Sequence, residues 1–282
     1  MRLGDGPGSG NFEDRTGQSG GGGGGIGGGL IGLLLPLIAS RFGIVGVLIL
    51  GLGYCALSSM GGLGGGGGGS PTTTGKSTLT TEQRRVLDGT LASTQKVWGE
   101  IFQQAGGTYK PTRLVAYSNA NQSGCGAAQA AMGPFYCPTD ESIYIDPSFF
   151  DELARRFQAP GDAAQAYVIA HEVGHHIQKL EGTLDRAQSA QARSSNAAGN
   201  AVQVGVELQA DCYAGVWAKR SSRLEAGDIE EGMRAAEAIG DDMLTKGRVS
   251  PDNFTHGTSA QRQEALNRGL STGNPASCNY AR

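Results

Sequence analysis

The chain has 282 residues, with 23 Lys and Arg residues against 26 Asp and Glu residues and a formal net charge of −3. It contains no basic run and no basic stripe interleaved with aromatic residues, so nucleic acid is not an expected partner. Glycine contributes 48 residues, and the runs at 20–25 and 64–69 cannot bury enough apolar surface to offset their backbone entropy. We therefore expect residues 1–29 to be a disordered, Gly-rich segment and residues 61–77 to be a Gly/Ser/Thr linker.

Between the two glycine runs lies an apolar segment, residues 30–60. Its uncharged part, 42–60, has nineteen residues, about enough to cross a ~30 Å hydrocarbon core at ~1.5 Å per residue. Arg41 separates it from the shorter apolar stretch 30–39 and would mark the cytoplasmic edge. A cleaved signal peptide and a buried core helix are the alternatives, but some forty residues come first and glycine flanks the segment. The sequence thus predicts one transmembrane helix at about 42–60, with the remainder extracytoplasmic at the cell membrane.

Four of the five cysteines follow the predicted span: Cys125, Cys137, Cys212 and Cys278. This number fits two disulfides in an oxidising compartment. We favour the pairs Cys125–Cys137 and Cys212–Cys278, one of three possible connectivities. The alternative is that these cysteines are reduced and buried.

Residues 78–282 have the size of one domain with its own core. Strand-forming runs occur at 112–118 and 142–146, whereas 185–200 shows no clear pattern. Strands come first and helices later, without βαβ alternation, so we expect an α+β fold without a parallel sheet. Apolar spacing predicts helices over 80–105, 163–180, 201–219, 225–244 and 259–269, with a helical turn over 151–156.

The predicted helix 163–180 contains the motif H-E-x-x-H. His171 and His175 are four residues apart, hence on one face of a helix, where two imidazoles can bind one tetrahedral Zn²⁺. Glu172 is rotated by about 100° from His171, so it can reach a metal-activated water without binding the metal. The helix is otherwise uncharged, and it holds three of the four histidines of the chain. These features favour a zinc site over a chance match.

A third ligand is expected on the next helix. Glu207 and Asp211 form another i, i+4 pair within an Ala/Val-rich segment. Two histidines and Glu207 would leave the fourth zinc position open, and Asp211 could accept the second ring N–H of a ligand histidine. The alternative, a solvated acidic helix face, fits the apolar surroundings less well.

Two further histidines are weaker candidates. His176 is rotated by about 100° from His175 and is expected to have a packing or supporting role. His256 is a lone loop histidine, for which a surface position is the ordinary expectation. Its alternative role is to donate to the oxyanion of a tetrahedral intermediate, with Arg262 orienting it or the substrate.

The pattern H-E-x-x-H followed by E-x-x-x-D resembles the gluzincins, the thermolysin-like enzymes. That resemblance implies that His171, His175 and Glu207 bind zinc and that Asp211 orients a histidine. More specifically, the chain resembles the bacterial family of neutral zinc metallopeptidases. The matching stretches are Asn11–Arg15, Cys125–Cys137, Ile143–Asp146, His171–Gln178, Glu207–Tyr213 and Phe254–His256.

The family is similar to the HtpX-type membrane proteases, in which a histidine shortly before an arginine lies near the zinc. This implies catalytic roles for His256 and Arg262, although HtpX-type enzymes have several spans and this sequence shows one. By analogy with zincin-like enzymes, the strand Ser142–Asp146 is expected at the sheet edge that binds extended peptide.

Together these features predict a membrane-anchored, zinc-dependent endopeptidase with a zincin-like α+β domain and one Zn²⁺ per chain. Glu172 would be the general base and a peptide or protein the substrate. The alternatives are a zinc-binding extracytoplasmic scaffold or receptor without peptidase activity, and a structural membrane protein with a coincidental motif.

Overall fold

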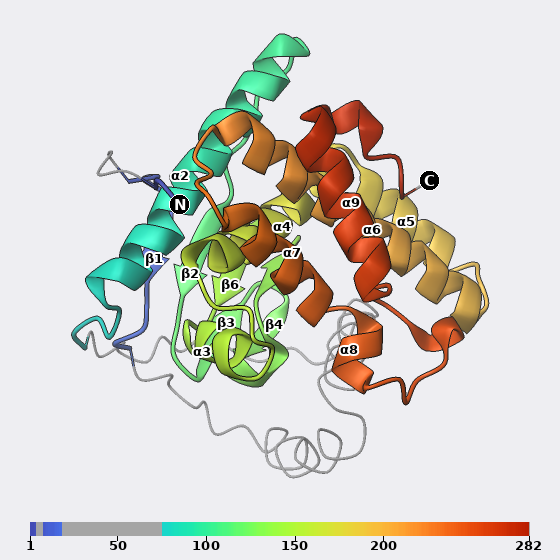
Figure 1. Cartoon of the computed structure of the whole chain (residues 1–282), viewed down its shortest axis with the longest axis horizontal. Helices are drawn as coiled ribbons and strands as arrows, with labels where there is room; N and C mark the ends of the chain where they lie inside the picture. Colours follow the sequence, from blue (N-terminus) through green and yellow to red (C-terminus); the bar gives the residue numbers. More distant parts are fainter. Residues whose placement is uncertain (4–7, 19–74, 282) are drawn as a thin grey trace, which may run out of the picture.

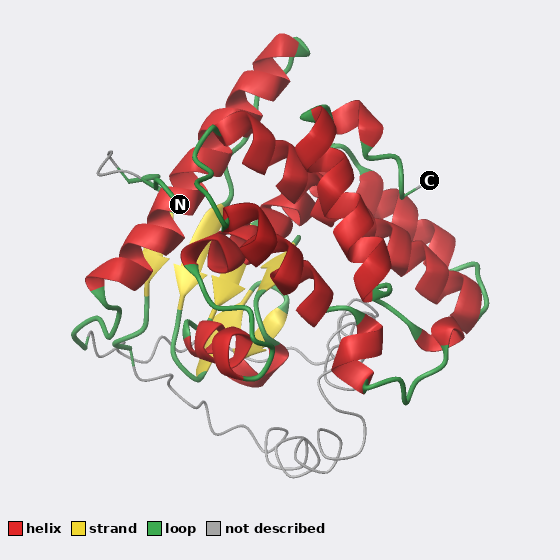
Figure 2. Ribbon diagram, in the orientation of Figure 1, coloured by secondary structure: helices red, strands yellow, loops and turns green. Residues whose placement is uncertain are grey.

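A small mixed sheet packs against a larger set of helices in the computed structural model of the chain, which describes residues 1–3, 8–18 and 75–281 (Figure 2). The α+β class expected from the sequence is confirmed. The four-stranded sheet has the order β1-β2-β6-β5, and its strands are β1 (Phe12–Asp14), β2 (Arg113–Ala116), β5 (Phe135–Cys137) and β6 (Ser142–Ile145). Strands β3 (Ala120–Ser123) and β4 (Gly126–Gln129) form a separate antiparallel hairpin.

The sheet is partly parallel, contrary to the expectation. Strand β2 pairs parallel with both β1 and β6, and only β5 is antiparallel to its neighbour. The β1–β2 connection contains a helix, so a βαβ unit does exist, but β1 has three residues and is too short to show a period of two. The expectation that Ser142–Asp146 forms the sheet edge is also wrong, because β6 lies between β2 and β5. The two edge strands are β1 and β5.

Side chains of the central strands alternate between two buried faces. Leu114 and Ile143 point into the main core with the helices, whereas Val115 and Tyr144 point into a smaller cluster that the β3–β4 hairpin covers. This is the period of two that a pleated strand imposes. Burial on both faces fixes the register of the sheet, because a slip by one residue would exchange the two sets.

The expected helices are present, with changes at their ends. The segment 185–200 contains α5 and the first turn of α6, where few residues are buried and the apolar pattern is weak. The single helix expected over 225–244 is broken at Gly240, which is extended and lies against the backbone of Ser259. The helices are α2 (Thr81–Gln104), α3 (Ser148–Arg155), α4 (Asp162–Leu180), α5 (Thr183–Gln191), α6 (Asn196–Ser221), α7 (Asp228–Ala238), α8 (Asp241–Thr245) and α9 (Ser259–Thr272), with short 3-10 turns at Ala130–Met132, Pro251–Asn253 and Pro275–Ser277.

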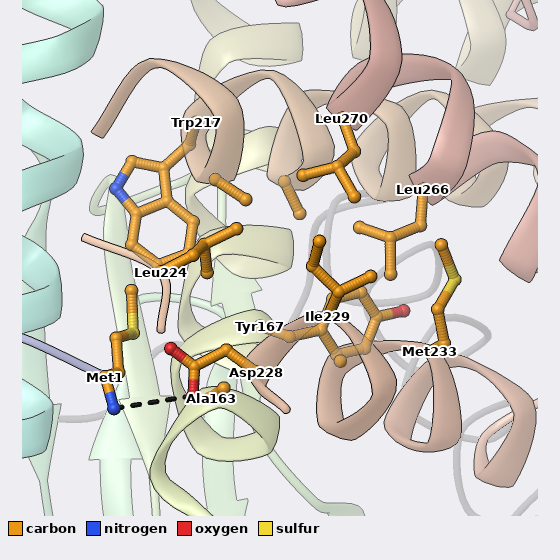
Figure 3. A pocket seen from close by; sticks show the side chains of 13 residues that line it. Met1, Ala163, Tyr167, Trp217, Leu224, Asp228, Ile229, Met233, Leu266 and Leu270 are labelled. Atoms are coloured by element: carbon orange, nitrogen blue, oxygen red, sulfur yellow. Dashed lines mark ion pairs between the residues drawn. The ribbon is translucent and has the colours of Figure 1, made fainter. Parts of the chain in front are cut away.

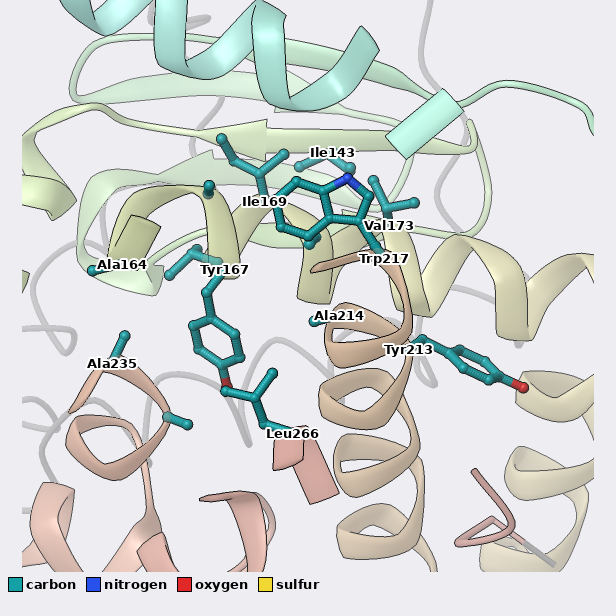
Figure 4. Packing of buried hydrophobic residues seen from close by; sticks show 14 of the residues in the cluster. Ile143, Ala164, Tyr167, Ile169, Val173, Tyr213, Ala214, Trp217, Ala235 and Leu266 are labelled. Carbon is teal, nitrogen blue, oxygen red and sulfur yellow. The ribbon is translucent and has the colours of Figure 1, made fainter. Parts of the chain in front are cut away.

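Helix α4 is the centre of the domain. It is buried on nearly all sides, between the sheet and the helices α2, α6 and α7 (Figure 1). Ile169 and Val173 of α4 pack near Ile143 of the sheet and Trp217 of α6 (Figure 4). The indole N–H of Trp217 donates to Ser93 Oγ of α2 at 3.0 Å, which links α2 to α6. A helix that is apolar all round is expected in such a buried position.

The described parts of residues 1–29 are folded, so the expectation of a disordered segment is wrong for them. Besides the pairing of β1 with β2, the side chains of Met1 and Leu3 belong to the main core. Ser9 donates through its backbone N–H to Asp88 of α2 at 2.8 Å. Residues on both sides of 19–74 therefore belong to one folded unit.

The two disulfides have the favoured pairing. Cys125–Cys137 joins the β3–β4 hairpin region to β5, and Cys212–Cys278 joins α6 to the segment after α9. The pairing is confirmed.

The transmembrane helix expected at 42–60 lies outside the described residues, as does most of the expected linker 61–77. Within the parts that are described, no helix combines the length and apolar character needed to cross a bilayer.

Helices α4 and α6 approach each other closely at a glycine. A Cβ built on Gly174 would lie 2.9 Å from the carbonyl oxygen and 3.0 Å from the Cα of Ala210. Gly174 stands between His171 and His175, and Ala210 stands between Glu207 and Asp211. The two helices therefore meet where both carry their polar pairs.

We predict that Gly174→Ala forces α4 and α6 apart and lowers the free energy of unfolding by about 1–3 kcal/mol, the usual cost of overpacking. Gly99→Ala in α2 is the control, because its Cβ would meet nothing within 4 Å. That substitution should raise stability by roughly 0.5–1 kcal/mol. Denaturant titration of the two variants measures both effects, and equal stabilities would contradict the close approach.

Candidate metal centre

Three side chains from two helices converge on one point. The Nε2 atom of His171 lies 3.2 Å from Glu207 Oε2, and the Nε2 atom of His175 lies 3.7 Å from Glu207 Oε1. The ligand atoms of the three residues all lie within 4.8 Å of one another. The structure thus brings together the residues that the sequence nominated as ligands.

The spacing and the charge of this group suit a divalent cation. Two ligand atoms at ~2.0–2.1 Å from a tetrahedral zinc ion lie ~3.3 Å apart, close to the observed separations. Glu172, Glu207 and Asp211 are buried carboxylates, and Arg262 is the guanidinium buried with them. With neutral imidazoles these groups carry an excess of two negative charges, which Zn²⁺ matches. Two nitrogen donors and one oxygen donor form the set typical of a catalytic zinc site with an open position.

Asp211 orients the ring of His171 through Nδ1, the ring nitrogen that does not face Glu207. Its Oδ1 atom accepts from His171 Nδ1 at 2.8 Å, from the Tyr167 hydroxyl at 2.6 Å and from Arg262 Nη2 at 2.9 Å. A carboxylate only accepts, so Nδ1 of His171 carries a hydrogen, which leaves Nε2, beside Glu207, as the ring nitrogen that can bind a metal. This is the arrangement expected for Asp211.

The charges of the group perturb one another strongly. Burial lowers the pKa of His171, but the carboxylates of Asp211 and Glu207 outweigh it and raise the pKa to about 10. Burial raises the pKa of Glu207, yet the imidazoles of His175 and His171 hold it well below its usual value. Such mutual stabilisation of opposite charges marks a site built to hold positive charge between acidic groups.

Glu172 is close to the ligands but outside their group. It is buried, and the backbone N–H of Tyr136 on β5 is near enough to its carboxylate to help lower its pKa. Burial is the main cause that raises the pKa of Glu172, while His175 and His171 oppose the rise. A carboxylate in this position can exchange a proton with a group bound next to the ligands.

Two polar partners were not anticipated from the sequence. Gln178 Oε1 lies 2.9 Å from Nδ1 of His175, and Gln203 Nε2 donates to Glu207 Oε1 at 3.0 Å. Gln178 is fully buried in a largely apolar helix and stands three residues after His175. That combination was the available signal, because a buried amide requires partners.

His256 lies on a loop beside the ligands. Its charge contributes to the lowered pKa of Glu207, and the adjacent Gly257 packs near Val204 and Leu208 of α6. Asp241 holds this loop. Its Oδ2 atom accepts the backbone N–H groups of residues 255–257 at 2.6–3.0 Å, and Oδ1 lies 3.2 Å from His256 Nδ1.

His176 has the packing role expected of it, whereas Arg262 contacts other residues than the expected His256. Arg262 is 1% exposed and bonds to Asp211 and Tyr167 next to His171. His176 lies between the Tyr136 hydroxyl, 3.0 Å from Nδ1, and the Lys110 carbonyl, 2.6 Å from Nε2. Both ring nitrogens of His176 are therefore engaged in packing the sheet against α4.

An apolar pocket lies apart from these ligands (Figure 3). Met1, Leu224 and Ile229 line it, and so does the ring of Tyr167, whose hydroxyl bonds to Asp211. Asp228 at its rim lies 3.4 Å from the N-terminal ammonium of Met1. The pocket offers no ligand group to the metal centre.

Residues 1–281 match the sequence profile of the family described as "Putative neutral zinc metallopeptidase". The chain belongs to this family. Its similar relatives include "Uncharacterized protein YpfJ" of Escherichia coli K12, 50% identical over 195 residues that cover 67% of this chain and 68% of the relative. "Uncharacterized protein Mb2605" of Mycobacterium bovis is 40% identical over 203 residues, 66% of each chain. No solved structure matches the chain. Zinc is the metal that the family implies, in agreement with the donor set.

In this member of the zinc metallopeptidase family, we predict that Glu207→Ala abolishes stoichiometric zinc. Loss of a ligand should weaken binding by more than the ~10–100-fold that removal of an outer partner costs. Glu264→Ala is the control, since Glu264 lies on the surface, where it pairs with Arg268 and accepts from the Tyr280 hydroxyl. Elemental analysis after dialysis against a weak chelator gives the zinc content. Equal zinc in both variants would exclude Glu207 as a ligand.

Proposed function

We propose that the protein is a zinc-dependent endopeptidase in which Glu172 is the general base. The observation that carries the proposal is a buried carboxylate next to a two-histidine, one-glutamate ligand group but outside it. A zinc ion held by His171, His175 and Glu207 supplies Lewis acidity, which polarises a peptide carbonyl and acidifies water. Glu172 accepts the proton of the attacking water and delivers it to the leaving amine.

Other residues of the chain support this chemistry. Asp211 keeps His171 in the tautomer that presents Nε2, and Arg262 and Tyr167 hold Asp211 in place. His256, fixed by Asp241, is suited to donate to the oxyanion that develops on the substrate. We assign Arg262 the role of positioning Asp211, because its burial keeps it from substrate.

The edge strand β5 is the proposed binding site for extended peptide. It pairs with β6 on one side, and the backbone N–H of its central residue, Tyr136, faces Glu172. A peptide added along this edge would therefore run past the general base, with its backbone hydrogen-bonded to the strand. The substrate class that fits is an unfolded or locally extended polypeptide.

We predict that Glu172→Gln retains zinc but lowers the rate of peptide hydrolysis by about 10²–10⁴-fold, the usual contribution of a general base. The change keeps the size of the side chain and removes only its basicity. Cleavage of denatured casein by the full-length protein, with zinc measured in parallel, tests this. Undiminished cleavage would refute the assignment of Glu172. Zinc binding without cleavage by the unaltered protein would favour the zinc-binding scaffold instead.

We propose further that the folded unit lies outside the cytoplasm, at the cell membrane. Two disulfides in one domain are typical of an oxidising compartment. A chain that crossed a bilayer once between residues 18 and 75 would leave β1 and β2 on opposite faces, where they could not pair. The proposal therefore replaces the expected single crossing with an arrangement in which both described parts share the outer face.

This arrangement predicts the labelling of two single cysteines, Arg2→Cys and Arg268→Cys, in a Cys55→Ala background. Arg2 and Arg268 have exposed side chains, at 67% and 49%. Both variants should react with a membrane-impermeant maleimide in intact cells, to the same extent as in lysed cells. Protection of the Arg2→Cys variant alone would mean that β1 does not join the sheet in the cell. Protection of both would place the unit in the cytoplasm.

A further inference from the structure

His175 depends on a neutral amide for its orientation, unlike His171, which has a carboxylate partner. Gln178 Oε1 lies 2.9 Å from His175 Nδ1, and Gln178 is fully buried. An amide can present either its oxygen or its nitrogen to the ring, and the two choices favour opposite tautomers of the histidine. What fixes the amide of Gln178 therefore decides which ring nitrogen of His175 is free for a metal.

Two backbone carbonyls, those of Val206 and Cys278, determine how the amide of Gln178 is oriented. Gln178 Nε2 donates to the carbonyl of Val206 at 2.8 Å and to Gln209 Oε1 at 2.9 Å. Gln209 Nε2 in turn donates to the carbonyl of Cys278 at 2.9 Å. Carbonyls only accept, so both amide nitrogens must face them, and Gln178 Oε1 must face His175. Nδ1 of His175 then carries a hydrogen, which leaves Nε2, on the side of Glu207, as the ring nitrogen that can bind a metal.

The far end of this chain of hydrogen bonds is held by a disulfide. Cys278 is bonded to Cys212, with 5.6 Å between the two Cα atoms, and both residues are buried. Cys212 directly follows Asp211 on α6, the helix that also carries Glu207. The disulfide thus fixes the Cys278 carbonyl relative to the helix that provides the third ligand.

We propose that Gln178, Gln209 and the Cys212–Cys278 disulfide form a positioning relay for the zinc ligand His175, so that opening the disulfide weakens zinc binding. The proposal rests on the zinc site of the proposed function and deepens it. Gln178 and Gln209 are positioning residues, because they act through His175 and do not touch the reacting atoms. Their effect should appear in zinc affinity, before any substrate is added.

The test is the zinc dissociation constant of the full-length protein, measured by competition with a chromophoric chelator after metal removal. Gln178→Leu should raise the constant by about 10–100-fold, as expected for loss of an outer partner of a ligand histidine. Cys212→Ala/Cys278→Ala should also weaken binding, whereas the control Cys125→Ala/Cys137→Ala, which removes the other disulfide, should stay within about twofold of the unaltered protein.

A double-mutant cycle separates positioning from general loss of stability. If the disulfide acts through the relay, removing it in a Gln178→Leu background should weaken zinc binding no further, whereas independent effects would add. If the cysteine variant does not fold, Gln209→Leu replaces it, because it breaks the relay and keeps the disulfide.

Failure of the proposed function can be distinguished from failure of the relay alone. Unaltered protein that binds no zinc would remove the proposed function and the relay with it. Normal zinc binding by Gln178→Leu, or full additivity in the cycle, would overturn the relay alone and leave the metal centre intact.

Discussion

The metal centre depends on the close crossing of α4 and α6. Neither helix alone offers more than two ligands, and Glu207 reaches the two imidazoles only because Gly174 lets the backbones approach at Ala210. A side chain at position 174 would have to displace the α6 backbone, since nothing flexible lies opposite it. The core around the crossing, including Trp217 and Tyr213, then holds the distance in place. Packing density and ligand geometry are thus the same constraint at this point.

Burial of so many charged groups is costly unless each is compensated. The guanidinium of Arg262 on α9 compensates the negative charge of two of these carboxylates, because it lies 2.9 Å from Asp211 and 3.8 Å from Glu207. Helix α9 comes this near because Gly269 lies against the backbone of Cys212, leaving no room for a Cβ. The front of the site has Glu172 and His256 as its polar groups. A divalent cation between these two sides would complete the balance of charge.

The features of this site that depend on residue spacing within a single helix could be predicted from the sequence. The i, i+4 spacing of His171 and His175, and of Glu207 and Asp211, is a local property, so the ligands and their helices could be anticipated. The number of cysteines allowed three disulfide pairings, and the favoured one is present. Strand β1 could not be found, because three residues show no periodicity and their partner β2 lies about a hundred positions later.

Contacts between residues of different helices and strands could not be predicted either, because the contacting residues are far apart in the sequence. Asp241 lies on a short helix broken from α7, and its role depends on the loop that folds back over it. Gln209 makes both of its contacts outside α6, with Gln178 on α4 and with Cys278 after α9. The position of β5 beside Glu172 depends on sheet order, which hydrophobic patterns do not encode. Arg262 was noticed in the sequence but connected to His256, since only the folded chain shows that its guanidinium turns toward Asp211.

The carbonyl of Cys278 belongs to a residue that is synthesised after α4, α6 and α9. During synthesis, the histidines and Glu207 can be present together while the anchor of His175 is still missing, and its disulfide cannot close before the chain meets an oxidising environment. If the proposed relay operates, a newly made chain would therefore hold a metal ion loosely until its last residues have been synthesised and the Cys212–Cys278 disulfide has closed.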